Sequence, residues 1–189
     1  MSPESDCSLE GYRNYLRVLA GLHLSPMLRR KVDASDVVQE ALIKAHRHRD
    51  QFKGRTQAER AAWLRRILAN TLADLHRSFG RGKRELGLEQ SLEDALDRSS
   101  SCLGKILADE RAAPEDEEAI ASRHLHLSEA LARLPESQRS AVTLRYLYDP
   151  PCSLLEIARR LERTEKAAAG LVCRGLETLR KILREVEES

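Results

Sequence analysis

Hydrophobic residues recur every three or four positions along most of the chain, which is the spacing of one face of an α-helix. Leu9, Tyr12, Leu16, Leu19 and Leu22 predict a first helix in this way. The same spacing predicts further helices. One begins near 36, and the others extend over 57–79, 119–134, 136–148, 154–161 and 165–183. Proline and short polar segments interrupt the pattern between them. The pattern therefore predicts an all-α fold.

The last two predicted helices are adjacent and have clear start signals. Ser153 and Glu156 have the spacing of a capping box, in which each side chain bonds to the backbone of the other. A turn near 162–164 follows, and Thr164 can cap the longer helix after it. Two helices joined by so short a turn, the second rich in basic residues, are typical of a helix-turn-helix. An ordinary helical hairpin has the same pattern.

Residues 85–118 lack a sustained hydrophobic stripe. They contain three consecutive serines at 99–101, Pro114 and an acidic run at 115–118. Such a composition buries little surface, so it predicts a mobile segment with at most a short helix near 103–107. We therefore expect two small helical domains, 1–84 and 119–189, joined by a flexible acidic linker over 85–118, with the helix-turn-helix in the second domain.

The charge of the chain is informative about possible partners only when it is counted segment by segment. The 189 residues include 32 basic and 30 acidic side chains, a formal net charge of +2. Residues 1–87 hold 17 basic and 10 acidic residues, a net +7, whereas 88–128 hold 4 and 10, a net −6. Residues 129–189 hold 11 and 10, a net +1. The near-neutral total is a cancellation between segments, so it does not argue against a nucleic-acid partner.

Other function classes are disfavoured by composition. Aromatic residues make up only 4%, and Leu, Ala, Glu and Arg are abundant, which argues against a mostly β protein. Neither a membrane span nor a secretory signal is recognisable, so we expect a cytoplasmic protein. Cys7, Cys102, Cys152 and Cys173 are far apart, which argues against a disulfide framework or a zinc site. No phosphate-binding loop or hydrolase motif occurs, so we expect no catalytic residues, metal or cofactor.

Three segments, in sequence order, carry a resemblance to a known family. DASDVVQEALIKAHR at 33–47 resembles the helix with which RNA polymerase sigma factors of the extracytoplasmic-function (ECF) type bind the clamp coiled coil of the largest polymerase subunit. AWLRRILANTLADLHR at 62–77 resembles the helix that opens and recognises the −10 promoter element. LARLPESQRSAVTLRYL at 131–147, followed by SLLEIARRL at 153–161, resembles the −35-binding domain. The resemblance implies a promoter-specificity subunit whose partners are core RNA polymerase, promoter DNA and an anti-sigma factor.

The resemblance implies that five residues of the first motif contact the polymerase: Asp36, Gln39, Glu40, Lys44 and Arg47. They lie outside the hydrophobic face of the predicted helix, and a face of mixed charge suits a polar protein contact. Considered without the resemblance, the same face favours an ordinary solvated helix surface.

The resemblance likewise implies a set of −10 contacts: Phe52, Lys53, Arg55, Arg66, Asn70 and Arg77. Arg66 and Asn70 are one helical turn apart and project together, and the Asn70 amide offers both a donor and an acceptor to a base edge. Further basic residues can hold phosphates: Arg60, Arg65, Arg81, Lys83 and Arg84. For Trp63, core packing is favoured over stacking on DNA.

The implied −35 contacts lie in the second helix of the helix-turn-helix and its turn: Arg163, Thr164, Lys166, Ala169, Gly170 and Arg174. The family usually has Gly in this turn and basic or polar residues in the middle of the helix, whereas this chain has Glu162 and Ala169-Gly170-Leu171. Because Ala and Gly make no bidentate base contacts, we expect −35 recognition to depend on phosphate contacts, close backbone approach and DNA shape.

Two other classes of function remain as alternatives. A freestanding helix-turn-helix regulator would bind duplex DNA specifically without polymerase, usually as a dimer on a palindrome. The polymerase-binding motif ahead of the helix-turn-helix argues against it. A helical adaptor that binds only proteins would have no salt-dependent affinity for DNA, and the crowding of basic residues over 60–84 argues against it.

Overall fold

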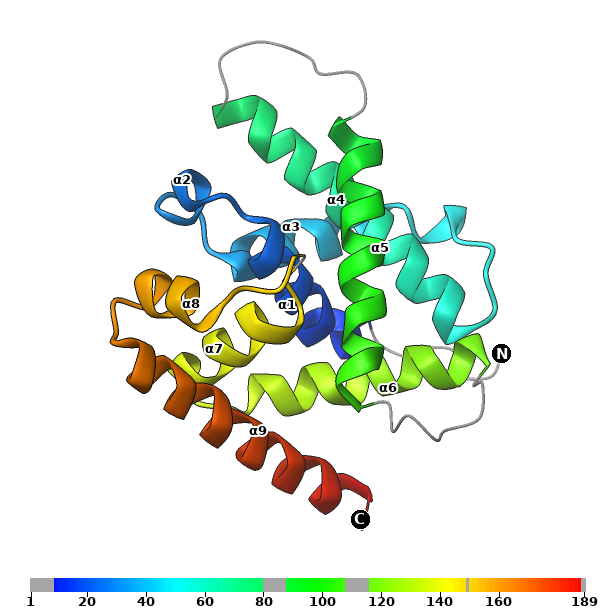
Figure 1. Ribbon diagram of the computed structural model, residues 1–189. Helices are drawn as coiled ribbons and strands as arrows, with labels where there is room; N and C mark the ends of the chain where they lie inside the picture. The colour runs from blue at the N-terminus through cyan, green and yellow to red at the C-terminus, as the bar shows by residue number, and fades with distance from the viewer. Residues whose placement is uncertain (1–8, 80–87, 108–115, 149, 188–189) are drawn as a thin grey trace.

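The structure is a computed structural model, and it describes residues 9–79, 88–107, 116–148 and 150–187. Within these ranges the chain forms helices joined by turns and contains no strand, which confirms the all-α prediction (Figure 1). The elements in chain order are η1 (Leu9–Tyr12), α1 (Arg13–His23), α2 (Pro26–Arg29), α3 (Ala34–Arg47), η2 (Arg49–Gln51), α4 (Gln57–Phe79), α5 (Leu88–Leu107), α6 (Glu117–Ala132), α7 (Glu136–Tyr146), α8 (Leu154–Arg160) and α9 (Glu165–Glu187).

Side-chain caps fix several helix starts. The predicted capping box of α8 is present, since the Glu156 N–H donates to Ser153 Oγ at 3.2 Å and the Ser153 N–H donates to Glu156 Oε2 at 2.8 Å. At α9 the Ala167 N–H donates to Thr164 Oγ1 at 3.2 Å, as predicted for a threonine cap. These bonds satisfy backbone donors that have no partner within the helix, and so they define where each helix begins.

The principal hydrophobic core is shared by both halves of the chain. Most of its largest buried side chains come from α1, α4, α5 and α6: Tyr15, Leu16, Leu19, Leu64, Leu68, Leu72, Leu96, Leu103, Leu127 and Leu131. A second, smaller cluster lies between α7, α8 and α9, and comprises Ala141, Leu144, Cys152, Ile157, Ala158, Ala168 and Val172. The helix-turn-helix thus has its own core, while α6 joins it to the amino-terminal helices.

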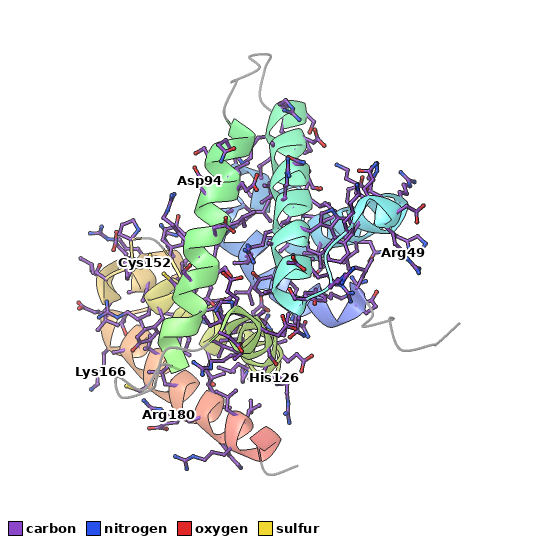
Figure 2. The ribbon with its side chains drawn as sticks, turned by 90° about the vertical axis from the view of Figure 1, so that its right-hand side faces the viewer. Arg49, Asp94, His126, Cys152, Lys166 and Arg180 are labelled. Carbon is purple, nitrogen blue, oxygen red and sulfur yellow. The ribbon has the colours of Figure 1, made fainter. Side chains whose placement is uncertain are left out.

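The prediction of a flexible linker over 85–118 is wrong for residues 88–107. These form the 20-residue helix α5, which runs antiparallel beside α4 (Figure 2). Leu96 and Leu103 of α5 are fully buried, and so are the small side chains of Ser99 and Ser100. The serines do not break the helix, because their hydroxyls find partners in the core: Ser99 Oγ bonds to His23 Nε2 at 3.0 Å, and Ser100 Oγ bonds to the Tyr15 hydroxyl at 2.9 Å. Residues 117–118 also belong to a helix, the first turn of α6.

The turn of the helix-turn-helix contains a left-handed residue. Glu162 has a φ of 54°, at the position where the family usually has glycine. Residues other than Gly, Asn and Asp are uncommon in this region, because their Cβ atom comes close to the following carbonyl oxygen. The turn therefore has the backbone geometry of the motif without its usual residue.

Candidate nucleic-acid interfaces

Helix α3 has the two faces that the sequence predicts. Its hydrophobic side chains are buried: Val37, Val38, Ala41, Leu42 and Ala45. Asp36, Gln39, Glu40 and Arg47 are exposed, and Lys44 is half-buried. The exposed face also includes Ile43, whose side chain is 37% exposed. The sequence analysis did not single out Ile43, and a single exposed apolar residue of this kind is common on protein surfaces.

Four of the five predicted polymerase contacts already have partners within the chain. Glu40 Oε1 lies 4.0 Å from Lys44 Nζ. Asp36 accepts the Asp33 N–H at 3.3 Å and so completes the cap of α3. Gln39 Oε1 accepts a hydrogen bond from Arg13 of α1 at 2.9 Å. Lys44 Nζ donates to Asp74 of α4 at 2.8 Å, and this bond lowers the pKa of the Asp74 carboxyl. These residues therefore also hold α3 in place.

The loop before α4 is organised around one aromatic side chain. Phe52 packs on Trp63, with ring centroids 5.1 Å apart, and the Arg60 guanidinium lies 5.5 Å from the centre of the Phe52 ring. Trp63 is half-buried against the principal core, which supports core packing. Gly54 is required here, because a Cβ at this position would lie 2.5 Å from Phe52 Cζ. The neighbouring cations Lys53 and Arg55 are exposed.

The cations of α4 divide between an outer and an inner face. Arg66 and Asn70 are both exposed, one turn apart, and neither has a polar partner among the described residues. Arg77 is exposed and donates to Asp74 at 2.5 Å. Arg65, which the sequence placed among the phosphate-binding cations, instead points inward and donates to Asp97 of α5 at 2.5 Å. The candidates Arg81, Lys83 and Arg84 lie outside the described residues.

The amino terminus of α4 is capped from a distant part of the chain. Glu118, in the first turn of α6, accepts the N–H groups of Gln57 at 2.9 Å and Ala58 at 3.0 Å. A carboxylate at a helix amino terminus satisfies free backbone donors and interacts favourably with the helix dipole. Sequence reasoning did not find this contact, because 60 residues separate Glu118 from Ala58.

A buried polar network also links α1, α4, α5 and α6. The Tyr15 hydroxyl accepts a hydrogen bond from Arg65 at 2.9 Å and bonds to Ser100 Oγ at 2.9 Å. Ser100 Oγ in turn lies 3.3 Å from His124 Nδ1, and the Tyr15 and His124 rings stack with centroids 6.4 Å apart. Burial, together with the charges of Arg65 and Arg123, lowers the pKa of His124 to about 4. His124 is therefore neutral at pH 7.

The outer face of α9 carries the predicted −35 residues. Arg163, Thr164, Lys166 and Arg174 are exposed, while Ala169 and Gly170 are half-exposed. Thr164 Oγ1 is occupied by the helix cap, so this residue has a structural role as well as its predicted one. Figure 2 shows Lys166 on α9 at one edge of the molecule and Arg49, which precedes the Phe52 loop, at the opposite edge. The two candidate DNA-binding faces are thus well separated.

Gly170 provides space on this face. A Cβ at position 170 would lie 3.1 Å from Arg174 Nη1, so the guanidinium lies directly against the helix backbone at the glycine. Among the described residues no partner of the Arg174 guanidinium is found. The glycine that weakens the helix therefore also makes room for the cation one turn after it.

The described residues offer little support for other site types. They contain no group of three or more His, Cys, Asp or Glu side chains placed to hold a metal ion. None of the helices in these ranges has the length and hydrophobicity needed to cross a membrane.

Comparison with known proteins finds two family matches in the chain. The family described as Sigma-70 region 2 matches residues 12–82, and Sigma-70, region 4 matches residues 124–179. The chain is 30% identical to the ECF RNA polymerase sigma factor SigW of Bacillus subtilis (strain 168) over 177 residues, which are 93% of this chain and 83% of that protein. It is 36% identical to the RNA polymerase sigma-H factor of Pseudomonas aeruginosa over 114 residues, 60% of this chain and 54% of that protein. No solved structure matches the chain significantly.

The two family matches fall on the two parts of the molecule that carry the candidate faces. Region 2 covers α1 to α4, including the polar face of α3 and the exposed residues of α4. Region 4 covers the helix-turn-helix. With these matches in this order, and with a relative that aligns along almost the whole chain, the protein belongs to the ECF family of RNA polymerase sigma factors.

Proposed function

We propose that this sigma factor binds core RNA polymerase through the outer face of α3, the −10 element through α4 and the loop before it, and the −35 element through α9. On this proposal it is a specificity subunit that acts in the cytoplasm, and not an enzyme. Residues 1–84 and 119–189 correspond to its two functional parts. We expect an anti-sigma factor as a further partner, from the family resemblance alone.

The observation that carries the proposal is the presence of two separate exposed faces, each with cationic or amide side chains that have no partner among the described residues. Arg66 and Asn70 on α4 provide a cation and an amide one turn apart, both open to solvent. The half-buried Phe52 ring lies close to the start of the same helix and packs on Trp63. Unstacked bases bind to surfaces of this kind by stacking and by hydrogen bonds to their edges. The α4 region therefore suits an opened strand.

The face of α9 suits duplex DNA instead. Lys166 and Arg174 project from one side of a helix that follows a short turn, the geometry that places a recognition helix in the major groove. An arginine that approaches guanine can donate to both O6 and N7. Arg174 has no intramolecular partner for its guanidinium among the described residues, so it is available for such a contact.

The proposal is tested by in vitro transcription with core polymerase, this chain and a library of genomic promoter fragments. We expect promoter-dependent initiation that neither core polymerase nor the chain gives alone. Specific duplex binding by the chain in the absence of polymerase would instead support a freestanding regulator, and no salt-dependent DNA binding with or without polymerase would support a protein-only adaptor.

The placement of the −10 site is tested by Asn70→Ala. We expect slower promoter opening with unchanged affinity for core polymerase, because Asn70 lies on α4 and is not one of the residues proposed to contact the polymerase. Asn14→Ala is the matched control, since it makes the same chemical change on α1, at a half-exposed residue with no polar partner among the described residues. Equal opening rates for the two variants would refute the assignment of Asn70.

A further inference from the structure

A cleft of about 1010 Å³ lies between α1, α2 and the start of α3 on one side and α7 and α8 on the other. Figure 1 shows α2 and α8 at the same edge of the molecule. The volume is at the upper end of the range of about 300–1,000 Å³ that small-molecule sites occupy. None of the residues proposed above to contact polymerase or DNA lines this cleft, so the proposed function leaves it without a role.

Four arginines from four different helices line the cleft: Arg17 of α1, Arg29 of α2, Arg139 of α7 and Arg160 of α8. Among the described residues, none of the four forms a salt bridge with a carboxylate. Burial lowers the pKa of Arg29, and the positive charge of Arg160 lowers it as well, which means that these two guanidinium groups repel each other. An anion bound between them would replace this repulsion by attraction.

Three of these arginines are held in position by contacts that leave donors free. Arg29 donates to two backbone carbonyl oxygens at the end of α1, one of them Leu24 O at 2.9 Å. Arg139 donates to the carbonyl oxygen of the last residue of α6 at 3.4 Å, and the Arg160 guanidinium lies 4.6 Å from the centre of the Tyr148 ring. Because a guanidinium group has five N–H donors, each of the three keeps donors for a ligand. Groups that are fixed beforehand also lose less conformational freedom on binding.

The remaining charged groups of the lining do not neutralise these cations. Two carboxylates, Asp33 and Glu136, stand against the four arginines and leave a net charge of +2, since burial lowers the pKa of His23 and keeps it neutral. The Asp33 carboxylate is engaged in the cap of α3, where it accepts the Ser35 N–H at 2.7 Å. Glu136 lies in the first turn of α7, a helix that has no side-chain cap at Pro135. The amino terminus of α7 therefore adds to the attraction for an anion.

We propose that this cleft binds a di- or triphosphate group, either free or as part of a nucleotide. A guanidinium group matches the geometry of a phosphate and binds it through two parallel hydrogen bonds. The arginines come from different helices around one cleft, so neighbouring phosphates of one ligand can contact more than one of them. Buried apolar side chains also line the cleft, namely Val18, Leu22 and Leu144, and they suit the base of a nucleotide. The inference does not depend on the proposed function.

The site is tested by isothermal titration calorimetry of the free chain at pH 7 with inorganic triphosphate and with adenosine and guanosine triphosphates, without magnesium. We expect saturable binding that Arg160→Gln weakens about tenfold, the low end of the value of a hydrogen bond to a charged group. Arg159→Gln is the matched control, because Arg159 is the adjacent exposed arginine of α8 and does not line the cleft. It should bind as the wild type does.

A second variant tests the site by a gain of affinity, which loss of folding cannot produce. Glu136→Gln removes the carboxylate that opposes an anion, so it should bind triphosphate about threefold more tightly. Glu129→Gln, at an exposed position of α6 outside the cleft, should not. Tighter binding of a nucleotide than of inorganic triphosphate identifies the nucleotide as the ligand, and equal affinities identify the free polyphosphate.

Three outcomes overturn the proposal. The first is the absence of saturable binding by the wild type. The second is an Arg160→Gln or Glu136→Gln variant whose affinity equals that of its control. The third is tighter binding of a hexaglutamate peptide than of triphosphate, which would assign the cleft to an acidic protein segment. Because the titrations contain no polymerase, failure of the proposed function shows separately, as absence of transcription.

Discussion

At the scale of single residues, Gly170 destabilises helix α9 but leaves space for a neighbouring side chain. Glycine inside a helix is less stable than alanine by roughly 0.5–1 kcal/mol, because it loses more backbone freedom on folding. In this chain the missing side chain leaves room for the Arg174 guanidinium on the outer face of α9. A position that weakens the helix can thus be retained for what it allows its neighbour to do.

Gly170→Ala is therefore expected to separate stability from DNA binding. The variant should be more stable by roughly 0.5–1 kcal/mol, yet the holoenzyme should bind the −35 element about fivefold more weakly, the low end of the value of one base contact. Gly21→Ala in α1 is the control, since a Cβ there meets nothing within 4 Å. It should gain stability without loss of affinity. Equal promoter affinities, measured by titration on −35 fragments with polymerase present, would show that Arg174 does not depend on Gly170.

His124 gives the molecule a predictable dependence on pH. Its side chain is 7% exposed, and its pKa of about 4 lies below the ordinary value of 6.5. The unfolded chain therefore binds more protons than the folded chain between these values. Since stability rises with pH wherever the unfolded state binds more protons, His124 should destabilise the fold by up to about 3 kcal/mol as the pH falls from 6.5 to 4.

This effect is measurable by urea unfolding at pH 5 and pH 7. His124→Gln should lose less stability on acidification than the wild type, and His126→Gln, at an exposed position of the same helix, should behave as the wild type. Proton NMR titration of the His124 ring checks the same point without a substitution. A titration midpoint near 6.5 would contradict the burial of a neutral imidazole.

At the scale of elements, α5 shows where the sequence was informative and where it was not. The helices on either side were predictable from their hydrophobic spacing, and α4 has the predicted bounds of 57–79. Helix α5 was missed because two of its buried positions are Ser99 and Ser100, which look like loop residues until Tyr15 and His23 are placed against them. Whether such serines are buried depends on residues that are distant in the sequence. The same is true of the inward position of Arg65 and of the contact that Glu118 makes with α4.

The packing of α5 leads to a direct test of whether residues 88–107 form a mobile linker. Leu96→Ala should destabilise the protein by about 2–5 kcal/mol, because it removes a fully buried side chain and leaves a cavity. Leu92→Ala, at a half-buried position one turn earlier, should cost less. Chemical denaturation measures both values. A Leu96→Ala variant as stable as the wild type would mean that α5 does not pack on α4 in solution.

At the scale of the whole molecule, the shared core predicts that both halves unfold together. Trp63 is the only tryptophan and lies in the amino-terminal half, so its fluorescence follows that half alone. Far-ultraviolet circular dichroism follows every helix. In urea the two signals should give superimposable transitions. A circular dichroism transition that continues after the fluorescence change is complete would show that the halves unfold independently.

Helix α5 has one more consequence, which concerns reach. Its 20 residues span about 30 Å as a helix but up to about 66 Å when fully extended. Unwinding it would therefore lengthen the connection between the two halves by about 36 Å, close to one turn of B-DNA. The folded helix thus holds residues that could span a longer distance if the helix unwound. If the proposed function is correct, unwinding of residues 88–107 would increase the distance over which one molecule can bind two promoter elements.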